Sequence, residues 1–173
     1  MTLQSAILLW LMAQTPSVDD IEGPPERLDR MGVIASAIAI ESGGNLTLAA
    51  AAMAISKHES HYSELVHRGE KMGDSGKSVC LMMVHRDGLR DDERWSTLAG
   101  SQLAPTKLCI ATGLMLWGRF WYCYRRAEPG QRWESIFSAY GTGAGCQIEK
   151  TGRDKARTFR AALSFLYRHK PKS

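Results

Sequence analysis

The chain lacks a long hydrophobic run. Its most apolar stretch, "SAILLWLMA" at residues 5–13, is far shorter than the roughly 20 residues that a transmembrane helix requires, so we expect no membrane span. No Lys or Arg precedes this stretch, which argues against a secretory signal. We therefore expect a short helix packed on the domain, with a degenerate export signal as the alternative.

Low-complexity tracts, repeats at a solenoid period and long blocks of one charge sign are also absent. Their absence argues against repeat architectures and against disorder beyond the chain ends. With 173 residues and a hydrophobic content of 44%, the chain is long and apolar enough for one globular unit with a buried core.

Cysteine is scarce, and none of the four cysteines belongs to a CxxC pair. This argues against a disulfide scaffold and against a zinc site of the CxxC type. Cys109 and Cys123 fall in one predicted helix, about 21 Å apart at 1.5 Å per residue, which is too far for a disulfide. Two alternatives stay open. Either Cys123 forms a disulfide with Cys146, or all four cysteines, including Cys80, are reduced thiols.

Acidic residues are rare late in the chain, where residues 150–173 hold eight Lys or Arg and one Asp. This balance favours contact with an anionic polymer such as cell-wall glycan, a membrane surface or nucleic acid. The solvated face of a terminal helix explains it equally well. No nucleic-acid-binding motif accompanies the charge, so we expect no nucleic-acid partner.

Helical periodicity dominates the first third of the chain. Residues 14–25 are interpreted as a linker whose double proline can start a helix, because proline fits the first helical turn. That helix carries apolar residues at helical spacing up to Gly43, namely Leu28, Met31, Ala35 and Ile38. A second, alanine-rich helix begins at Asn45 or Thr47, either of which can cap it.

Residues 63–90 lose the helical period and collect glycines, which predicts a long loop with a small hairpin at residues 78–85. A helix over residues 105–126 is apolar nearly all round and is expected to be a central buried element. A shorter helix over residues 132–140 follows. The last helix is amphipathic, with apolar positions at Ala156, Phe159, Leu163 and Leu166.

The expected fold class is mainly α, a helical domain with a small β or loop insertion. Residues 1–24 form an N-terminal helix and linker, and residues 25–173 form the main domain.

One acidic residue interrupts the apolar face of the second helix. Residues on this face are spaced 4, 3 and 4 apart: Leu48, Ala52, Ile55 and Glu59. Burial beside apolar groups raises the pKa of a carboxyl group, which is how a general acid stays protonated near neutral pH. The alternative is that the helix frays and Glu59 turns to solvent or to a histidine.

The neighbouring histidines raise the question of a metal. His58, Glu59 and His61 form HExH, whereas the zinc-protease motif HExxH places its histidines at i and i+4. Residues at i and i+3 still meet on a helix, and His67 or His85 could supply a third ligand. A zinc hydrolase therefore stays as an alternative, although we expect no metal and no other cofactor.

Four short motifs occur in a defined order: "ESH" at residues 59–61, "GDSG" at 73–76, "CLMMVH" at 80–85 and "SAYGTG" at 138–143. Together they resemble the catalytic region of goose-type lysozymes and soluble lytic transglycosylases in the lysozyme-like superfamily. The patterns of that region are ES, a loop with GD, GLMQ and YNxG. The resemblance covers residues 59 to about 145 and is specific in the combination of motifs.

The resemblance implies a lysozyme-like α+β fold that cleaves the β-1,4 bond between N-acetylmuramic acid and N-acetylglucosamine in peptidoglycan. Glu59 falls on the catalytic glutamate of the family, and Asp74 on the aspartate that helps to position water. Ser60 would support the helix end, and Tyr140 would lie beside the glutamate or the sugar. His85 occupies a place where goose-type enzymes can carry a second aspartate.

The chain departs from these motifs at Cys80 and Met83, which replace the glycine and glutamine of GLMQ, and at Gly141, which replaces the asparagine of YNxG. Losing the glutamine removes an amide that could orient sugar or backbone at the Met83 position. Hydrolysis is favoured because GD is present. A lytic transglycosylase with 1,6-anhydro products and a non-catalytic glycan-binding or structural relative are the alternatives.

The sequence leaves the biological setting open, because the compact size and the lack of a clear signal suit a phage-derived or injected enzyme as well as a bacterial periplasmic one. Peptidoglycan glycan strands are the expected partner, and the protein is expected to act as a monomer. The expected location is the periplasm or cell wall, or a phage particle.

Overall fold

The computed structural model describes residues 1–18, 20–88, 97–98, 101–143 and 145–169. Its helices are α1 (Leu3–Met12), α2 (Pro24–Glu41), α3 (Leu46–Ser60), α4 (Glu64–His67), α6 (Leu103–Arg119), α7 (Trp121–Arg126), α8 (Arg132–Thr142) and α9 (Lys150–His169). The strands are β1 (Ser78–Val79) and β2 (Val84–His85), which form an antiparallel hairpin. The predicted class, mainly α with a small β insertion, is confirmed.

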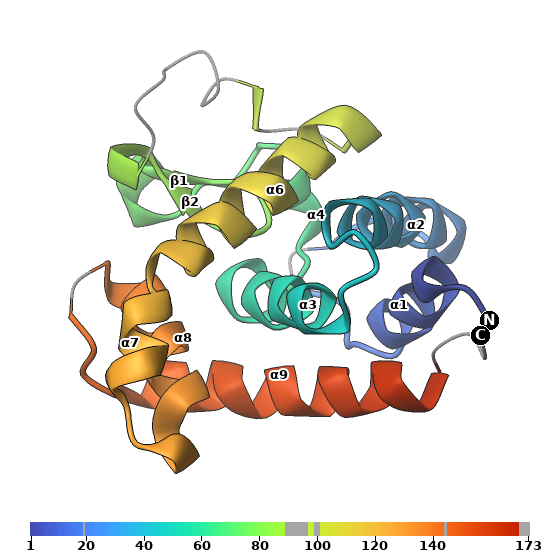
Figure 1. Ribbon diagram of the computed structural model, residues 1–173. Coiled ribbons are helices and arrows are strands. Elements are labelled where there is room, and N and C mark those ends of the chain that lie inside the picture. The colour runs from blue at the N-terminus through green and yellow to red at the C-terminus, as the bar shows by residue number, and fades with distance from the viewer. Residues whose placement is uncertain (19, 89–96, 99–100, 144, 170–173) are drawn as a thin grey trace.

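Helix α3 is the centre of the molecule and packs against α2, α6 and α9 (Figure 1). Residues 49–55 are fully buried, and five of these seven are alanines whose small side chains let the surrounding helices approach. The Asn45 side chain caps the helix by accepting hydrogen bonds from the backbone N–H groups of Thr47 and Leu48. The sequence predicted this helix and offered Asn45 and Thr47 as candidate caps. The structure shows that Asn45 is the cap.

Two helical predictions were wrong in detail. The expected helix over residues 105–126 breaks at Phe120 into α6 and α7, and α6 keeps Leu103 and Met115 exposed, so α3 rather than α6 is the buried centre. In α2, Leu28 is 47% exposed, because the buried face of that turn is occupied by Arg27 and Arg30.

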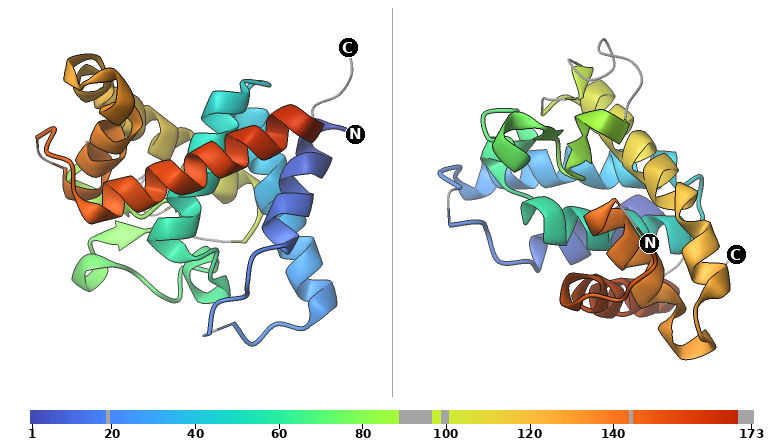
Figure 2. Two further views of the ribbon diagram at one scale, coloured as in Figure 1. Left: turned by 90° about the horizontal axis from the view of Figure 1, so that it is seen from below. Right: turned by 90° about the vertical axis from the view of Figure 1, so that its left-hand side faces the viewer.

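Helix α9 runs along one side of the molecule and packs on α1, α3 and α8 (Figures 1 and 2). Its buried face contains Ala156, Phe159 and Leu166, as the amphipathic pattern predicted. A Cβ at Gly152 would lie 1.8 Å from Ser138 Oγ, so only glycine permits the approach of α9 to α8.

The linker between α1 and α2 is tied to α4, a short helix that lies inside the predicted loop. The buried Glu64 carboxylate accepts hydrogen bonds from the backbone N–H groups of Ile21 and Glu22, at 3.1 and 3.0 Å. Arg30 pairs with the side chain of Glu22, Nε to Oε2 at 2.7 Å, and donates to the Tyr62 carbonyl. These bonds hold the linker against the end of α3.

The predicted hairpin is confirmed, with Ser78 opposite His85 and Val79 opposite Val84. The tip of the hairpin is buried in the core through Leu81 and Met82. A disulfide joins Cys80 to Cys109 on α6, and a second joins Cys123 on α7 to Cys146. The open question about Cys123 and Cys146 is thus answered by a bridge, and the alternative of four reduced thiols is wrong.

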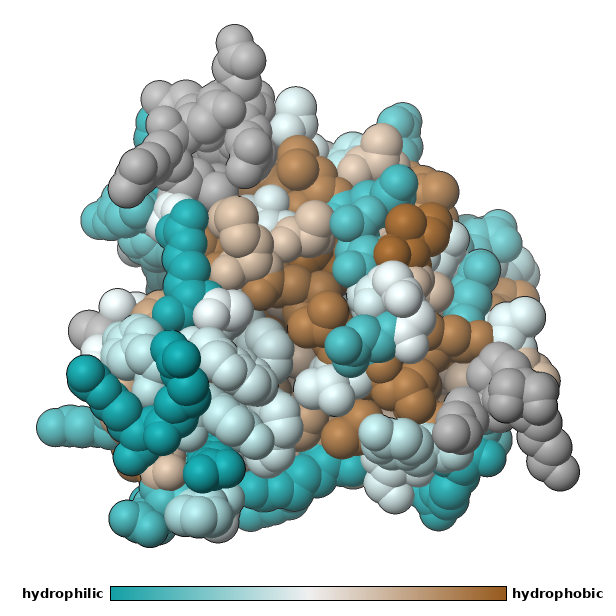
Figure 3. All heavy atoms as spheres, viewed as in Figure 1, coloured by the Kyte–Doolittle hydropathy of each residue, from teal (hydrophilic) through white to brown (hydrophobic). Residues whose placement is uncertain are grey.

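Hydrophobic residues lie across the middle of one face, over α6 and the adjoining helices, whereas hydrophilic side chains follow α7 and α9 (Figure 3). Within the described ranges, none of the helices combines the length and hydropathy of a membrane span.

Candidate active site

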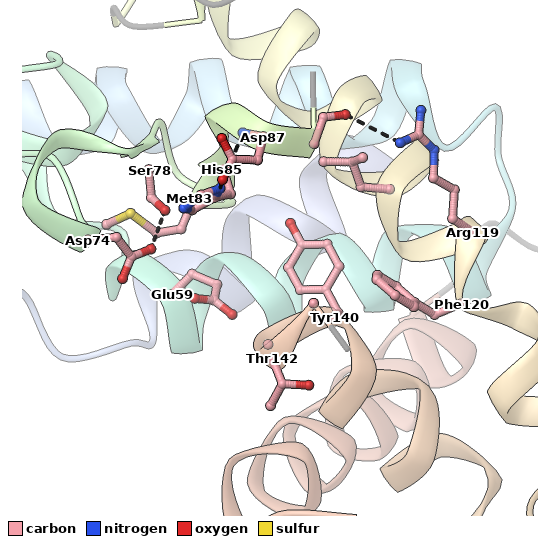
Figure 4. A pocket seen from close by; sticks show the side chains of 14 residues that line it. Glu59, Asp74, Ser78, Met83, His85, Asp87, Arg119, Phe120, Tyr140 and Thr142 are labelled. Atoms are coloured by element: carbon pink, nitrogen blue, oxygen red, sulfur yellow. Dashed lines mark hydrogen bonds and ion pairs between the residues drawn. The ribbon is translucent and has the colours of Figure 1, made fainter. Parts of the chain in front are cut away.

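A pocket of about 440 Å³ opens where the end of α3, the hairpin, the end of α6 and the end of α8 meet. Five of the six residues singled out from the sequence line it, namely Glu59, Asp74, Met83, His85 and Tyr140. Figure 4 shows Asp74, Met83 and His85 on the hairpin side and Tyr140 on the α8 side, with Glu59 between them. Residues more than 80 positions apart in sequence therefore line the same pocket.

Ser60 does not line this pocket. Its hydroxyl donates to the Ser56 carbonyl at 2.8 Å and accepts from the Tyr62 N–H at 3.3 Å, so it is engaged within the end of α3. The Ser60 hydroxyl is therefore bonded to the backbone at the end of α3, and the supporting role that the resemblance implies for it stays a prediction.

Glu59 belongs to the last turn of α3. The helix continues through Glu59 to Ser60 and ends at His61, whose left-handed φ of 52° reverses the chain. The Glu59 side chain is 21% exposed and lies in the pocket, so the alternative in which the helix frays and Glu59 turns away is not observed.

The surroundings of Glu59 are less apolar than the sequence suggested, because a lysine of α9 lies against the carboxylate. Lys155 Nζ is 2.5 Å from Glu59 Oε1, and the Lys155 side chain is 6% exposed. The same ammonium is 5.9 Å from the centre of the Tyr140 ring. The charged partner of Glu59 is thus a residue that the sequence interpretation missed.

A signal for Lys155 was nevertheless present. The buried face of α9 has residues spaced 4, 3 and 4 apart: Lys155, Phe159, Ala162 and Leu166. Lys155 therefore interrupts an apolar face in the same way as Glu59 does. Two interruptions of opposite charge, each on a strongly predicted helix, are candidates for a buried ion pair.

Tyr140 connects α8 to the hairpin. Its hydroxyl donates to the Met82 carbonyl at 2.8 Å. Burial raises the pKa of the Tyr140 phenol, and the negative charge of Glu59 adds to the effect. The phenol therefore stays protonated and keeps this hydrogen bond at all ordinary pH values.

Asp74 lies on an exposed turn before the hairpin. Its φ of 50° is left-handed, and its carboxylate accepts a hydrogen bond from the Ser78 hydroxyl. That bond, together with the backbone bridge between Gly73 and Ser78, fixes the turn to β1. Asp74 is thus a carboxylate in the pocket with access to water, in contrast to the more enclosed Glu59.

His85 lies further along the pocket and has an acidic neighbour that the sequence interpretation did not single out. The backbone N–H of Asp87 donates to His85 Nδ1 at 3.3 Å, and the Asp87 carboxylate is 3.6 Å from the same nitrogen. The short spacing between the two residues was the available signal. Both residues line the pocket together with Arg119 and Phe120.

A second hollow, of about 470 Å³, meets the pocket at Glu59 and Met83, which line both. Its other walls include the linker at residues 15–18, together with Lys57 and Ser60. The two hollows therefore adjoin at Glu59 and Met83, with the second hollow on the linker side. An extended ligand could contact both hollows while passing the Glu59 carboxylate.

The histidines around Glu59 do not converge. His58 Nε2 is bonded to Thr158 Oγ1 at 2.7 Å, and His67 Nε2 to Thr106 Oγ1 at 2.8 Å. Burial lowers the pKa of His67 to about 3, so its ring is neutral. No group of three or more His, Cys, Asp or Glu suited to a metal ion occurs within the described ranges, so the zinc alternative has no ligand set there.

The site thus contains an enclosed carboxyl group, a second and more exposed carboxylate, a buried ammonium and a neutral phenol around one cleft. A pair of carboxyl groups with unlike surroundings is what most glycosidases use for acid/base chemistry on a glycosidic bond. Searches of protein-family models, of curated proteins and of solved structures found no match to this chain.

Proposed function

We propose that this protein is a peptidoglycan-cleaving glycosidase that acts on the β-1,4 bond between N-acetylmuramic acid and N-acetylglucosamine. The observation that carries the proposal is that Glu59 and Asp74 line one pocket and that a second hollow adjoins it at Glu59. A glycan strand laid along the cleft would have sugars on both sides of the Glu59 carboxyl group. The ordered motifs in the sequence support the same assignment.

In the proposed reaction Glu59 protonates the leaving glycosidic oxygen while the C1–O bond breaks and an oxocarbenium-like sugar forms. A water molecule adds to C1, and its proton passes to Asp74. Asp74 suits this role because its turn is exposed to water, while the Ser78 hydroxyl fixes the carboxylate. Tyr140 keeps the hairpin and α8 together on either side of the reacting bond.

The departures from the motifs are compatible with this assignment. Cys80, at the glycine position of GLMQ, has a left-handed φ of 64°, a conformation that glycine favours. Its disulfide to Cys109 holds the hairpin in place. Met83, at the glutamine position, lines both hollows and offers an apolar surface where the motif has an amide.

One observation favours a lytic transglycosylase as the second candidate. In that reaction the muramic 6-hydroxyl attacks C1, and Glu59 acts first as acid and then as base. The base step uses Glu59 as a carboxylate with a cationic neighbour, and Lys155 Nζ lies 2.5 Å from Glu59 Oε1. Asp74 would then have no part in the chemistry.

The test is digestion of purified peptidoglycan by the full chain, by Glu59→Gln and by Asp74→Asn, with mass spectrometry of the products. Glu59→Gln keeps the size of the side chain but removes the acid, so we expect loss of about 10²-fold or more in rate with the fold intact. Retained activity of Glu59→Gln would refute the proposal.

The remaining outcomes separate the alternatives. Reducing-end products that depend on Asp74 indicate hydrolysis, whereas 1,6-anhydro products from both wild type and Asp74→Asn indicate the transglycosylase. Binding to peptidoglycan without released fragments indicates a glycan-binding protein. The proposed partner is the glycan strand, at a bacterial cell wall or in the context of a phage.

A further inference from the structure

Lys155 is a buried cation whose position calls for an explanation. Its side chain is almost completely removed from water, and its Nζ pairs with Glu59 Oε1 at 2.5 Å. A buried ammonium is costly unless it is paired, and replacing a buried ion pair by apolar groups is often neutral or stabilising for the fold. Stability alone therefore does not account for a lysine at this point of α9.

The space for the ammonium comes from a glycine on α8. A Cβ built at Gly141 would lie 2.8 Å from Lys155 Nζ, and that nitrogen is the one atom it would meet within 4 Å. The neighbouring Tyr140 ring is 5.9 Å from the same nitrogen. A Cβ at position 141 would thus require the flexible end of Lys155 to shift from its place beside Glu59.

We propose that Lys155 is a positioning residue for Glu59 and that Gly141 is the residue that makes room for it. The inference rests on the proposed function of Glu59 as general acid. The ammonium fixes one carboxyl oxygen, Oε1, so that the other oxygen carries the proton toward the glycosidic oxygen. It also stabilises the negative charge that develops on Glu59 as the proton leaves, which is an interaction stronger in the transition state than in the ground state.

This arrangement accounts for the departure from YNxG at position 141. The Cβ of an asparagine there would lie 2.8 Å from Lys155 Nζ, so the ammonium could not keep its present position. The chain therefore carries a cation from α9 where the resembled motif carries an amide from the helix before it. Glycine at 141 and lysine at 155 form one functional unit.

The test compares four variants with the wild type: Lys155→Met, Gly141→Ala, the double variant that combines them, and Glu59→Gln. Lys155→Met keeps an unbranched, flexible side chain that is one atom shorter, and it removes the charge. Gly141→Ala adds a methyl group that displaces the flexible end of Lys155 while retaining the lysine. Gly32→Ala, at a helical glycine of α2 with open space around it, is the matched control.

We expect kcat to fall about 10- to 100-fold in Lys155→Met, the scale of a lost charge-stabilising contact, with KM changed less than about threefold. Gly141→Ala should lower kcat to a similar extent without lowering the melting temperature, because alanine favours the α8 helix. In the Lys155→Met background Gly141→Ala should have no further effect on kcat. Gly32→Ala should keep the wild-type kcat.

The results separate the two proposals. If Glu59→Gln is active, the proposed function fails and the inference with it. If Glu59→Gln is inactive while Lys155→Met has an unchanged or higher kcat, the positioning inference alone is overturned. It is also overturned if Gly141→Ala lowers kcat equally in both backgrounds. If Lys155→Met does not fold, Gly141→Ala decides, because the methyl group meets only the lysine end.

Discussion

At the scale of the residue, the site depends on two charged side chains that interrupt apolar faces. Glu59 was found from its spacing, and Lys155 is detectable by the same test. Their pairing was not predictable, because it is set by the contact of α3 with α9 across 96 positions of sequence. Local patterns therefore indicate which residues are unusual, whereas the packing of helices decides which of them meet.

The buried histidine of α4 gives a prediction at this scale. The pKa of His67 falls from its ordinary 6.5 to about 3 in the folded protein, through burial and the charge of Arg30. The unfolded chain therefore takes up a proton below pH 6.5 that the folded protein does not, and stability falls as the pH drops from about 6.5 toward 3.

We expect His67→Gln, which keeps a polar group toward Thr106, to flatten this part of the pH dependence. The measurement is the free energy of unfolding by urea between about pH 4 and pH 7. His61→Asn changes an exposed histidine and should keep the wild-type slope. Equal slopes for His67→Gln and the wild type would contradict the prediction.

At the scale of the element, the hairpin is held to the rest of the molecule in three ways. Leu81 and Met82 are inserted into the core, Tyr140 donates to the Met82 carbonyl, and Cys80 is bonded to Cys109. The β pattern predicted the hairpin itself. The attachments were not predictable, because each joins the hairpin to a residue 29 or more positions away.

The backbone at Cys80 gives a prediction for this element. Removing the disulfide in Cys80→Ala/Cys109→Ala should lower the free energy of unfolding by about 3–4 kcal/mol, from the loss of a crosslink across 29 residues. The free energy of unfolding of Cys80→Gly/Cys109→Ala should be about 1 kcal/mol higher than that of Cys80→Ala/Cys109→Ala. The reason is that glycine adopts the left-handed conformation at position 80 without cost.

Chemical denaturation of both double variants measures the difference. A Gly variant no more stable than the Ala variant would show that the hairpin backbone changes conformation when the bridge is removed. Peptidoglycan digestion by the same variants reports whether the hairpin wall still supports the reaction.

At the scale of the whole molecule, the helices were predictable because their apolar faces follow a simple period. The sequence interpretation missed the break at Phe120, the short α4 helix and the linker contacts of Glu64. These features depend on groups that meet only after the helices have packed. The position of the linker was likewise not predictable from the sequence. Its residues line the second hollow beside Glu59 only because the helices have packed.

The anchoring of the linker can be tested at position 64. Glu64→Gln removes the charge that holds the Ile21 and Glu22 N–H groups and pairs with Arg68. We expect the free energy of unfolding to fall by about 1–3 kcal/mol, which is the cost of leaving buried polar groups without hydrogen-bond partners. Because the linker lines the second hollow, we expect KM in the proposed peptidoglycan digestion to rise more than kcat falls. An unchanged KM would mean that the linker wall does not contact the substrate.

Helix α9 has one more consequence for the molecule. Near its far end Phe165 packs edge-on against Trp10 of α1, with ring centres 5.4 Å apart, and near its start Lys155 meets Glu59. Ten residues of continuous helix, about 15 Å, separate the two contacts. One continuous helix thus carries both the aromatic packing partner of the N-terminal helix and the charged partner of Glu59, so a shift of α9 along its axis would alter both contacts.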